Sequence, residues 1–74
     1  MKPYLKKMAD EWTSVLVGRH EVESFTGGLV NSSTMANYDS RGKGPRELLK
    51  VGHRVWYPKD VLMEWLESHC VDDG

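Results

Sequence analysis

The chain of 74 residues is predicted to fold as an α+β domain: a winged helix-turn-helix with a small three-helix core, a β-hairpin wing and an extra N-terminal helix. Two observations predict this fold. Helical patterns over residues 19–25 and 32–41 are separated by the turn Gly27-Gly28. Two short strand candidates then flank Gly52-His53 within a basic segment, and an amphipathic helix follows them.

The N-terminal residues are typical of an amphipathic helix followed by a short strand. Pro3 suits the first position of a helix, and apolar side chains recur at three- and four-residue spacing as far as Trp12. Val15 to Val17 is short, branched and apolar, which predicts a strand that Gly18 ends. The expected organisation is a helical extension over residues 1–13, a winged helix-turn-helix DNA-binding domain over residues 14–70 and a tail over residues 71–74.

The predicted helix-turn-helix follows Gly18. Glycine accepts the left-handed backbone conformation at a helix C-terminus, so Gly27-Gly28 is expected to end the first helix. Leu29 is expected to point inward after this turn. Asn31 is a good N-cap for the second helix, whose apolar face is formed by Met35 and Tyr38.

The segment after residue 41 predicts a hairpin and a closing helix. Glycine and proline in residues 42–45 stop the second helix. Strands over residues 48–51 and 54–57 fit a type II′ turn with Gly52 at its first central position, and Pro58 is expected to open the last helix. The expected core is Val22, Phe25, Leu29, Met35, Val55, Tyr57, Leu62, Trp65 and Leu66, and the buried stripe of the last helix also includes Val61 and Cys70.

Charge is distributed unevenly along the chain, whose formal net charge is −1. Residues 31–60 hold six basic and three acidic residues, whereas residues 61–74 hold four acidic residues and no Lys or Arg. Local potential, rather than net charge, governs the attraction of a surface to phosphates. The middle of the chain therefore remains compatible with nucleic-acid binding.

The sequence has no pattern typical of an enzyme, a metal site or a membrane protein. It lacks a nucleophile elbow and a phosphate-binding glycine loop, and its candidate ligands His20, His53, His69 and Cys70 lack metal-site spacing. No long apolar run predicts a membrane span, and the single cysteine favours a reducing compartment. We expect a cytoplasmic protein without catalysis, cofactor, metal or small-molecule substrate.

The outward face of the second helix suits contact with duplex DNA. Asn37 carries the donor and acceptor pair that matches adenine in the major groove, and Arg41 reaches guanine or phosphate. Free N–H groups and the helix dipole favour a phosphate at the helix start, formed by Ser32, Ser33 and Thr34. The alternative is an ordinary solvated face.

Basic residues also gather in the predicted loop and wing. They are Lys43, Arg46, Lys50, His53 and Arg54. A protruding basic hairpin beside a helix-turn-helix is suited to contact the DNA backbone or minor groove. Trp56 is either partly exposed on this hairpin or packed in the core.

Residues 19–69 resemble the excisionase and AlpA-type group of small phage and prophage DNA-binding proteins, which is related to the MerR-type winged helix. The ordered series that carries the resemblance is Glu21-Val22, Thr26-Gly27, Ser33-Thr34-Met35-Ala36-Asn37, Arg41-Gly42-Lys43-Gly44-Pro45, Lys50-Val51-Gly52, Val55-x-Tyr57, Asp60-Val61 and Trp65-Leu66. The resemblance implies a fold without catalysis that binds and bends DNA, often as several copies side by side and sometimes in contact with an integrase.

The resemblance also implies site residues. Its recognition helix enters the major groove and its wing contacts the adjacent groove or backbone, which assigns DNA contact to Ser32, Ser33, Thr34, Asn37, Arg41, Lys50, His53 and Arg54. Two features depart from the family pattern. The helix from Pro3 to Trp12 lies outside it, and the recognition helix holds a single Lys or Arg. The second departure fits a protein that needs neighbours or a partner to bind.

The expected function is therefore that of a duplex-DNA-binding accessory protein, in its most specific form a recombination directionality factor that bends attachment-site DNA and steers an integrase. A prophage transcriptional regulator with the same surface is the near alternative. An alternative of another class is a protein–protein interaction module. Its surface would be the apolar stripe of Tyr4, Leu5, Met8 and Trp12 together with the acidic tail.

Overall fold

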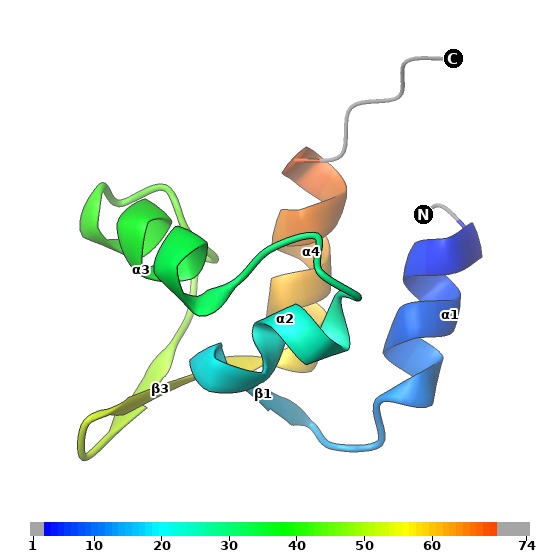
Figure 1. The fold of residues 1–74 in the computed structure, drawn as a ribbon, viewed down its shortest axis with the longest axis horizontal. Coiled ribbons are helices and arrows are strands. Elements are labelled where there is room, and N and C mark those ends of the chain that lie inside the picture. Colours follow the sequence, from blue (N-terminus) through cyan, green and yellow to red (C-terminus); the bar gives the residue numbers. More distant parts are fainter. Residues whose placement is uncertain (1–2, 70–74) are drawn as a thin grey trace.

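The computed structural model describes residues 3–69, in which four α-helices and one 3₁₀ turn are combined with a three-stranded antiparallel sheet in an α+β arrangement (Figure 1). The elements in chain order are α1 (Pro3–Glu11), β1 (Leu16–Gly18), η1 (the 3₁₀ turn, Arg19–Glu21), α2 (Val22–Phe25), α3 (Ser32–Ser40), β2 (Leu49–Val51), β3 (Arg54–Pro58) and α4 (Lys59–His69). The predicted tail and Cys70 lie outside the described residues.

The sheet has the order β1-β3-β2, so β3 is its central strand. Val17 is paired with Tyr57, and Lys50 is paired with Val55. Val55 and Tyr57 are buried while the intervening Trp56 is half-buried, as the two-residue period of a strand requires. Partial exposure of Trp56 is thereby confirmed.

The turn of the hairpin agrees with the type II′ prediction. Gly52 has a φ of 63°, whereas His53, like every other non-glycine residue described, has a negative φ. A type II′ turn needs a positive φ at its first central residue alone, which glycine supplies without steric cost. The turn chemistry thus sets the register of β2 and β3.

Glycine ends both α2 and α3, as predicted. After α3, Gly42 has a φ of 69° and the N–H of Lys43 donates to the carbonyl of Tyr38 at 2.8 Å. After α2, the N–H of Gly28 donates to the carbonyl of Glu23 at 2.9 Å. Both bonds satisfy carbonyls that the end of a helix leaves without a partner.

The helix predicted over residues 19–25 is divided into η1 and α2. The division falls at Glu21, whose backbone φ of −106° departs from regular α-helix. Its side chain turns back and accepts the N–H of Gly18 at 3.0 Å. This cap stabilises a tight 3₁₀ turn directly after β1.

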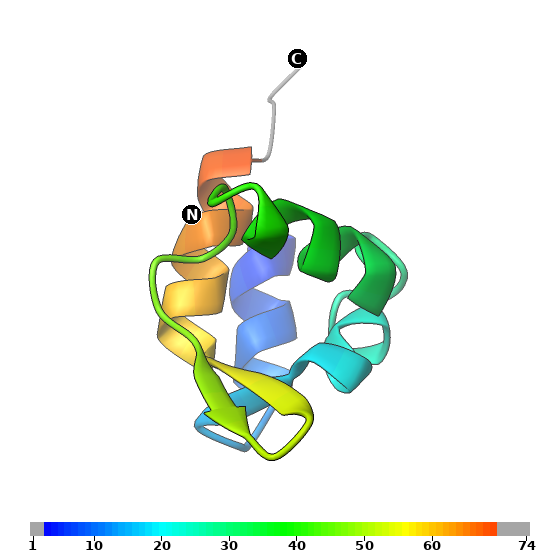
Figure 2. The same cartoon turned by 90° about the vertical axis from the view of Figure 1, so that its left-hand side faces the viewer.

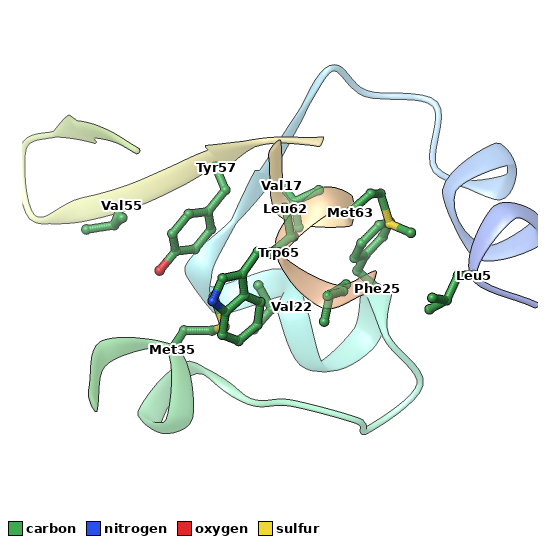
Figure 3. Close-up of a cluster of buried hydrophobic side chains, with 11 residues drawn as sticks. Leu5, Val17, Val22, Phe25, Met35, Val55, Tyr57, Leu62, Met63 and Trp65 are labelled. Carbon is green, nitrogen blue, oxygen red and sulfur yellow. The ribbon is translucent and has the colours of Figure 1, made fainter. Parts of the chain in front are cut away.

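The core lies between α4, the sheet, α2 and α3 (Figure 3). Every predicted core residue is buried except Leu29, which is 63% exposed, so that prediction is wrong. Thr26 takes the inward position instead: its buried hydroxyl donates to the carbonyl of Val22 at 2.7 Å and accepts the N–H of Val30 at 3.3 Å. These bonds and the positive φ of Gly27 and Gly28 turn Leu29 outward and bring Val30 against the core.

The N-terminal helix is part of the same packing. Leu5 is fully buried in the core, and α1 packs beside α4. The Lys59 Nζ group donates to the carbonyls of Ala9 at 3.1 Å and Trp12 at 2.8 Å. A lysine from the first turn of α4 therefore caps the C-terminal end of α1.

Pro58 was predicted to open the last helix, but it ends β3 opposite Leu16 instead. The helix begins one residue later, at Lys59, whose N–H donates to the carbonyl of Val15 at 2.7 Å. Proline has no N–H to donate, so it is tolerated at a strand end of this kind. Met63, which the sequence pattern did not single out, joins the buried face of α4.

Candidate nucleic-acid interface

Helix α3 presents a polar face to solvent, and its start is well capped. The Asn31 side-chain oxygen accepts the N–H of Thr34 at 2.9 Å and the Thr34 hydroxyl at 3.1 Å. Thr34 is half-buried, and both its N–H and its hydroxyl are already hydrogen-bonded to Asn31. Ser32, Ser33 and Asn37 are exposed, and their side chains make no hydrogen bond within residues 3–69.

Arg41 is exposed at the opposite end of α3, where it forms the C-cap rather than the last helical residue. Its guanidinium lies 5.2 Å from the centroid of the Tyr38 ring. This contact holds the cation near the C-terminal end of the helix, away from Ser32. The five residues predicted on this helix thus spread along its whole length.

The hairpin formed by β2 and β3 lies on the same side of the molecule as α3 (Figures 1 and 2). In Figure 2 this side faces the viewer, with α3 above and the hairpin below. Lys50, His53 and Arg54 are exposed on the hairpin. In the described part of the chain, neither Lys50 nor Arg54 has an ion-pair partner, so both charges remain available to a ligand.

Lys43 and Arg46 are not part of the hairpin. Both lie in the segment between α3 and β2, where the main-chain carbonyl of Lys43 accepts the indole N–H of Trp65 at 2.9 Å. Arg46 donates to Glu64 at 3.0 Å and lies 3.7 Å from Glu47. The hydrogen bond to Glu64 raises the pKa of Arg46. Arg46 is directed to α4 and its charge is compensated there.

A hydrogen-bonded network connects η1, α3 and β3. The Arg19 side chain donates to Asp39 at 2.6 Å and to the Tyr57 hydroxyl at 3.0 Å. The Tyr57 hydroxyl in turn donates to the same carboxylate oxygen of Asp39 at 2.5 Å. The Arg19 and Asp39 side chains are 24% and 11% exposed, so solvent screens this pair less than a surface pair. The network fixes α3 relative to the central strand.

The network also shifts pKa values and constrains the chain around it. Burial, together with the hydrogen bond to Asp39, raises the pKa of Tyr57 to about 12, so the phenol keeps its proton. Burial lowers the pKa of Arg19, but the bonds to Tyr57 and Asp39 outweigh this and raise it. A Cβ at Gly44 would overlap the Asp39 carboxylate, so only glycine fits there without displacing it.

A small concavity of about 160 Å³ lies where the hairpin tip approaches η1 and the start of α3. It is lined by Arg19, His20, Ser32, His53, Arg54 and Val55. Three predicted site residues therefore meet here although they are far apart in the sequence. Sequence reasoning missed Arg19 and treated His20 only as a metal-ligand candidate, because the local pattern around residues 19 and 20 gives no signal for either role.

The opposite side of the molecule carries an open groove of about 640 Å³ between α1 and the turn after α2. Tyr4 and Leu29, each 63% exposed, are among its lining residues. Leu5 is fully buried and Met8 and Trp12 are partly buried against the core. Most of the predicted N-terminal stripe is thus used inside the protein, which leaves Tyr4 as its exposed member.

Two further properties concern the chain between residues 3 and 69. No helix in this range is both long enough and apolar enough to cross a bilayer. No three His, Cys, Asp or Glu side chains in this range are arranged to hold a metal ion.

Comparison of the chain with protein-family models, with curated proteins and with solved structures finds no match.

Proposed function

We propose that this chain is a winged helix-turn-helix protein that binds duplex DNA as an accessory factor. In this proposal α2 and α3 form the helix-turn-helix, α3 is the recognition helix that enters the major groove, and the β2–β3 hairpin is the wing. No catalytic step is assigned. Ser32, Ser33, Asn37 and Arg41 contact DNA from α3, and Lys50, His53 and Arg54 contact it from the wing.

One observation carries the proposal: α3 and the hairpin lie on one side of the molecule (Figure 2), and α3 has an uncommitted polar face while the hairpin has unpaired cations. Small side chains at Ser32, Ser33 and Ala36 let a helix backbone approach another surface closely. Cations that lack carboxylate partners are free to replace the counterions of phosphates, which favours binding. Both requirements for a duplex-binding face are met by neighbouring elements.

The most specific form of the proposal is an excisionase-like recombination directionality factor that bends attachment-site DNA and steers a phage integrase. The ordered sequence series from Glu21 to Leu66 supports it. The face has few free cations, so one copy of the chain should bind DNA weakly. Several copies bound side by side along the DNA would strengthen the binding of each one. A prophage transcriptional regulator would use the same face, and footprinting on an attachment site beside an integrase gene separates the two roles.

The test measures binding to an unspecific duplex by fluorescence anisotropy at about 50 and about 200 mM salt. Lys50→Ala and Arg54→Ala should each weaken binding at all sequences and reduce the salt slope by about one unit. Lys6→Ala is the matched control, since it removes an exposed lysine of α1, a helix that lies away from α3 and the hairpin in Figure 1. A complex that is independent of salt, or equally weakened by Lys6→Ala, would overturn the proposal.

A protein–protein interaction module is the second candidate function, and the open groove beside α1 is the observation that favours it. Exposed Tyr4 and Leu29 on one groove provide apolar and aromatic contact area of the kind that interfaces use. Absence of duplex binding at low salt, with the fold intact, would favour this function over the first.

A further inference from the structure

We propose that the concavity between the hairpin tip, η1 and the start of α3 holds one DNA backbone phosphate, and that His20 and His53 make this contact dependent on pH. The inference rests on the proposed function, because it names which group of the duplex this site takes. It also adds His20, a residue of η1, to the binding face. The consequence is a DNA affinity that falls as pH rises.

The geometry supplies donors from three elements around one small volume. His53 and Arg54 come from the hairpin, His20 from η1 and Ser32 from the first turn of α3, and all four are exposed around about 160 Å³. A phosphate oxygen accepts hydrogen bonds from imidazolium, guanidinium and hydroxyl groups alike. Convergence of these donor types favours an anion with several acceptor oxygens.

His20 is held in place rather than free to move away. Its ring lies edge-on to Trp56, with ring centroids 5.2 Å apart. It also lies against the backbone of Gly18, where an added Cβ would come within 2.5 Å of the ring. The glycine and the half-buried tryptophan therefore position the imidazole on the rim of the concavity before any ligand arrives.

The fixed charges around the two histidines cancel, so the positive charge offered to an anion there depends on the two imidazoles. Arg19 and Glu21 face them from η1, Arg54 from β3, and the neutral Ser32 from α3. Arg19 is compensated by Asp39, and Glu21 is engaged by the N–H of Gly18. Arg54 lines the concavity without an ion-pair partner in the described residues, and its charge offsets that of Glu21, so a net positive charge at this place requires an imidazolium.

The sign of the pH dependence follows from the charge on imidazole. Histidine changes charge in the range of about pH 5 to 8, and the protonated form is the one attracted to phosphate. Binding to a phosphate therefore takes up protons. Affinity for a duplex should be about three- to tenfold tighter at about pH 6 than at about pH 8, and the salt slope should be steeper at the lower pH by roughly one unit.

The experiment measures duplex affinity from about pH 6 to 8 for the whole chain, for the double variant His20→Gln/His53→Gln and for His69→Gln. His69, the third histidine, lies against Tyr38 and Trp65 and provides the matched control. The double variant should lose the pH dependence, and His69→Gln should keep it. Circular dichroism confirms that each variant is folded. Unchanged pH dependence in the double variant, or its loss in His69→Gln, would overturn the proposal.

A second measurement separates DNA phosphate from a free anion. Sulfate, whose charge is constant in this pH range, is added while the imidazole signals are followed by NMR. Binding of duplex with the expected pH dependence supports the proposal, and sulfate shifts at His20 and His53 but not His69 support the same site. If no duplex binds at either pH, the proposed function fails. Sulfate shifts at the two histidines would then indicate a site that binds a free anion but not DNA. The absence of these shifts would show that the anion site does not exist.

Discussion

Asp39 is the residue on which the geometry of the candidate interface depends. Its carboxylate receives bonds from Arg19 and Tyr57, which come from two other elements, and Gly44 closes over it. Partners 18 and 20 residues away in the chain supply these bonds. No local pattern predicts them, because an isolated Asp on a helix is equally consistent with a solvated side chain.

The first prediction concerns Tyr57. Tyr57→Phe removes the hydroxyl that bridges Arg19 and Asp39, and it should lower the free energy of unfolding by about 1–2 kcal/mol near neutral pH. Tyr38→Phe is the control, because the Tyr38 hydroxyl has no hydrogen bond within residues 3–69 while its ring contacts are kept. Urea denaturation of the three proteins measures both effects.

The same variant tests the pKa of Tyr57. The folded-state value of about 12 exceeds the ordinary value of 10.0, so the stabilisation is complete below about pH 10 and is lost as pH rises towards 12. The stability difference between the parent chain and Tyr57→Phe should therefore shrink over this window. Equal alkaline losses in both proteins would show that the phenol is not held in its protonated form.

At the scale of elements, α3 shows two asparagines with different roles. Asn31 is an N-cap whose side chain bonds to Thr34, as the sequence predicts. Asn37 is exposed, and within residues 3–69 its side-chain amide has no hydrogen bond. A structural role for the Asn37 amide therefore has no contact to support it, and base readout remains its proposed role.

The second prediction compares these two residues. Asn31→Ala should cost about 0.5–2 kcal/mol of stability. Asn37→Ala should change stability by less than about 0.5 kcal/mol and relax base preference at one position by about 1–3 kcal/mol. Thermal melting and competition against single-base variants of a bound site measure the two effects. Loss of stability without altered preference in Asn37→Ala would assign that residue a structural role instead.

On the scale of the whole molecule, two unlike sides are held apart by one core. The side formed by α3 and the hairpin carries free polar groups and cations, whereas the side of α1, which lies away from them in Figure 1, carries the open groove. Leu5 and Lys59 connect α1 to this core, so the helix is not an appendage. Helix α1 thus packs against α4, and α4 packs against the sheet that bears the hairpin.

The third prediction tests that connection. Leu5→Ala should lower the free energy of unfolding by about 2–4 kcal/mol, because it leaves a cavity in a fully buried position. Tyr4→Ala, at the 63% exposed neighbouring position, should cost less than about 1 kcal/mol. Chemical denaturation measures both, and equal costs would mean that α1 does not pack as described.

The sequence by itself determined the order of the α-helices and strands, the glycine ends of α2 and α3, the N-cap of α3 and the type II′ turn of the hairpin. These features follow from backbone conformation and from hydrogen bonds between near neighbours, which short patterns record. For the same reason it identified the exposed residues of α3 and the hairpin, since a residue opposite an apolar face is exposed whatever the partner of that face.

Only the tertiary structure decided which distant residues meet. It placed Thr26 and Val30 inward in place of Leu29, paired Arg46 with Glu64, and brought His20 to the hairpin tip. It also buried Leu5 of the N-terminal helix in the shared core. Each outcome depends on competition among long-range contacts for the same buried space or the same charge. The result of that competition is visible only in the folded structure.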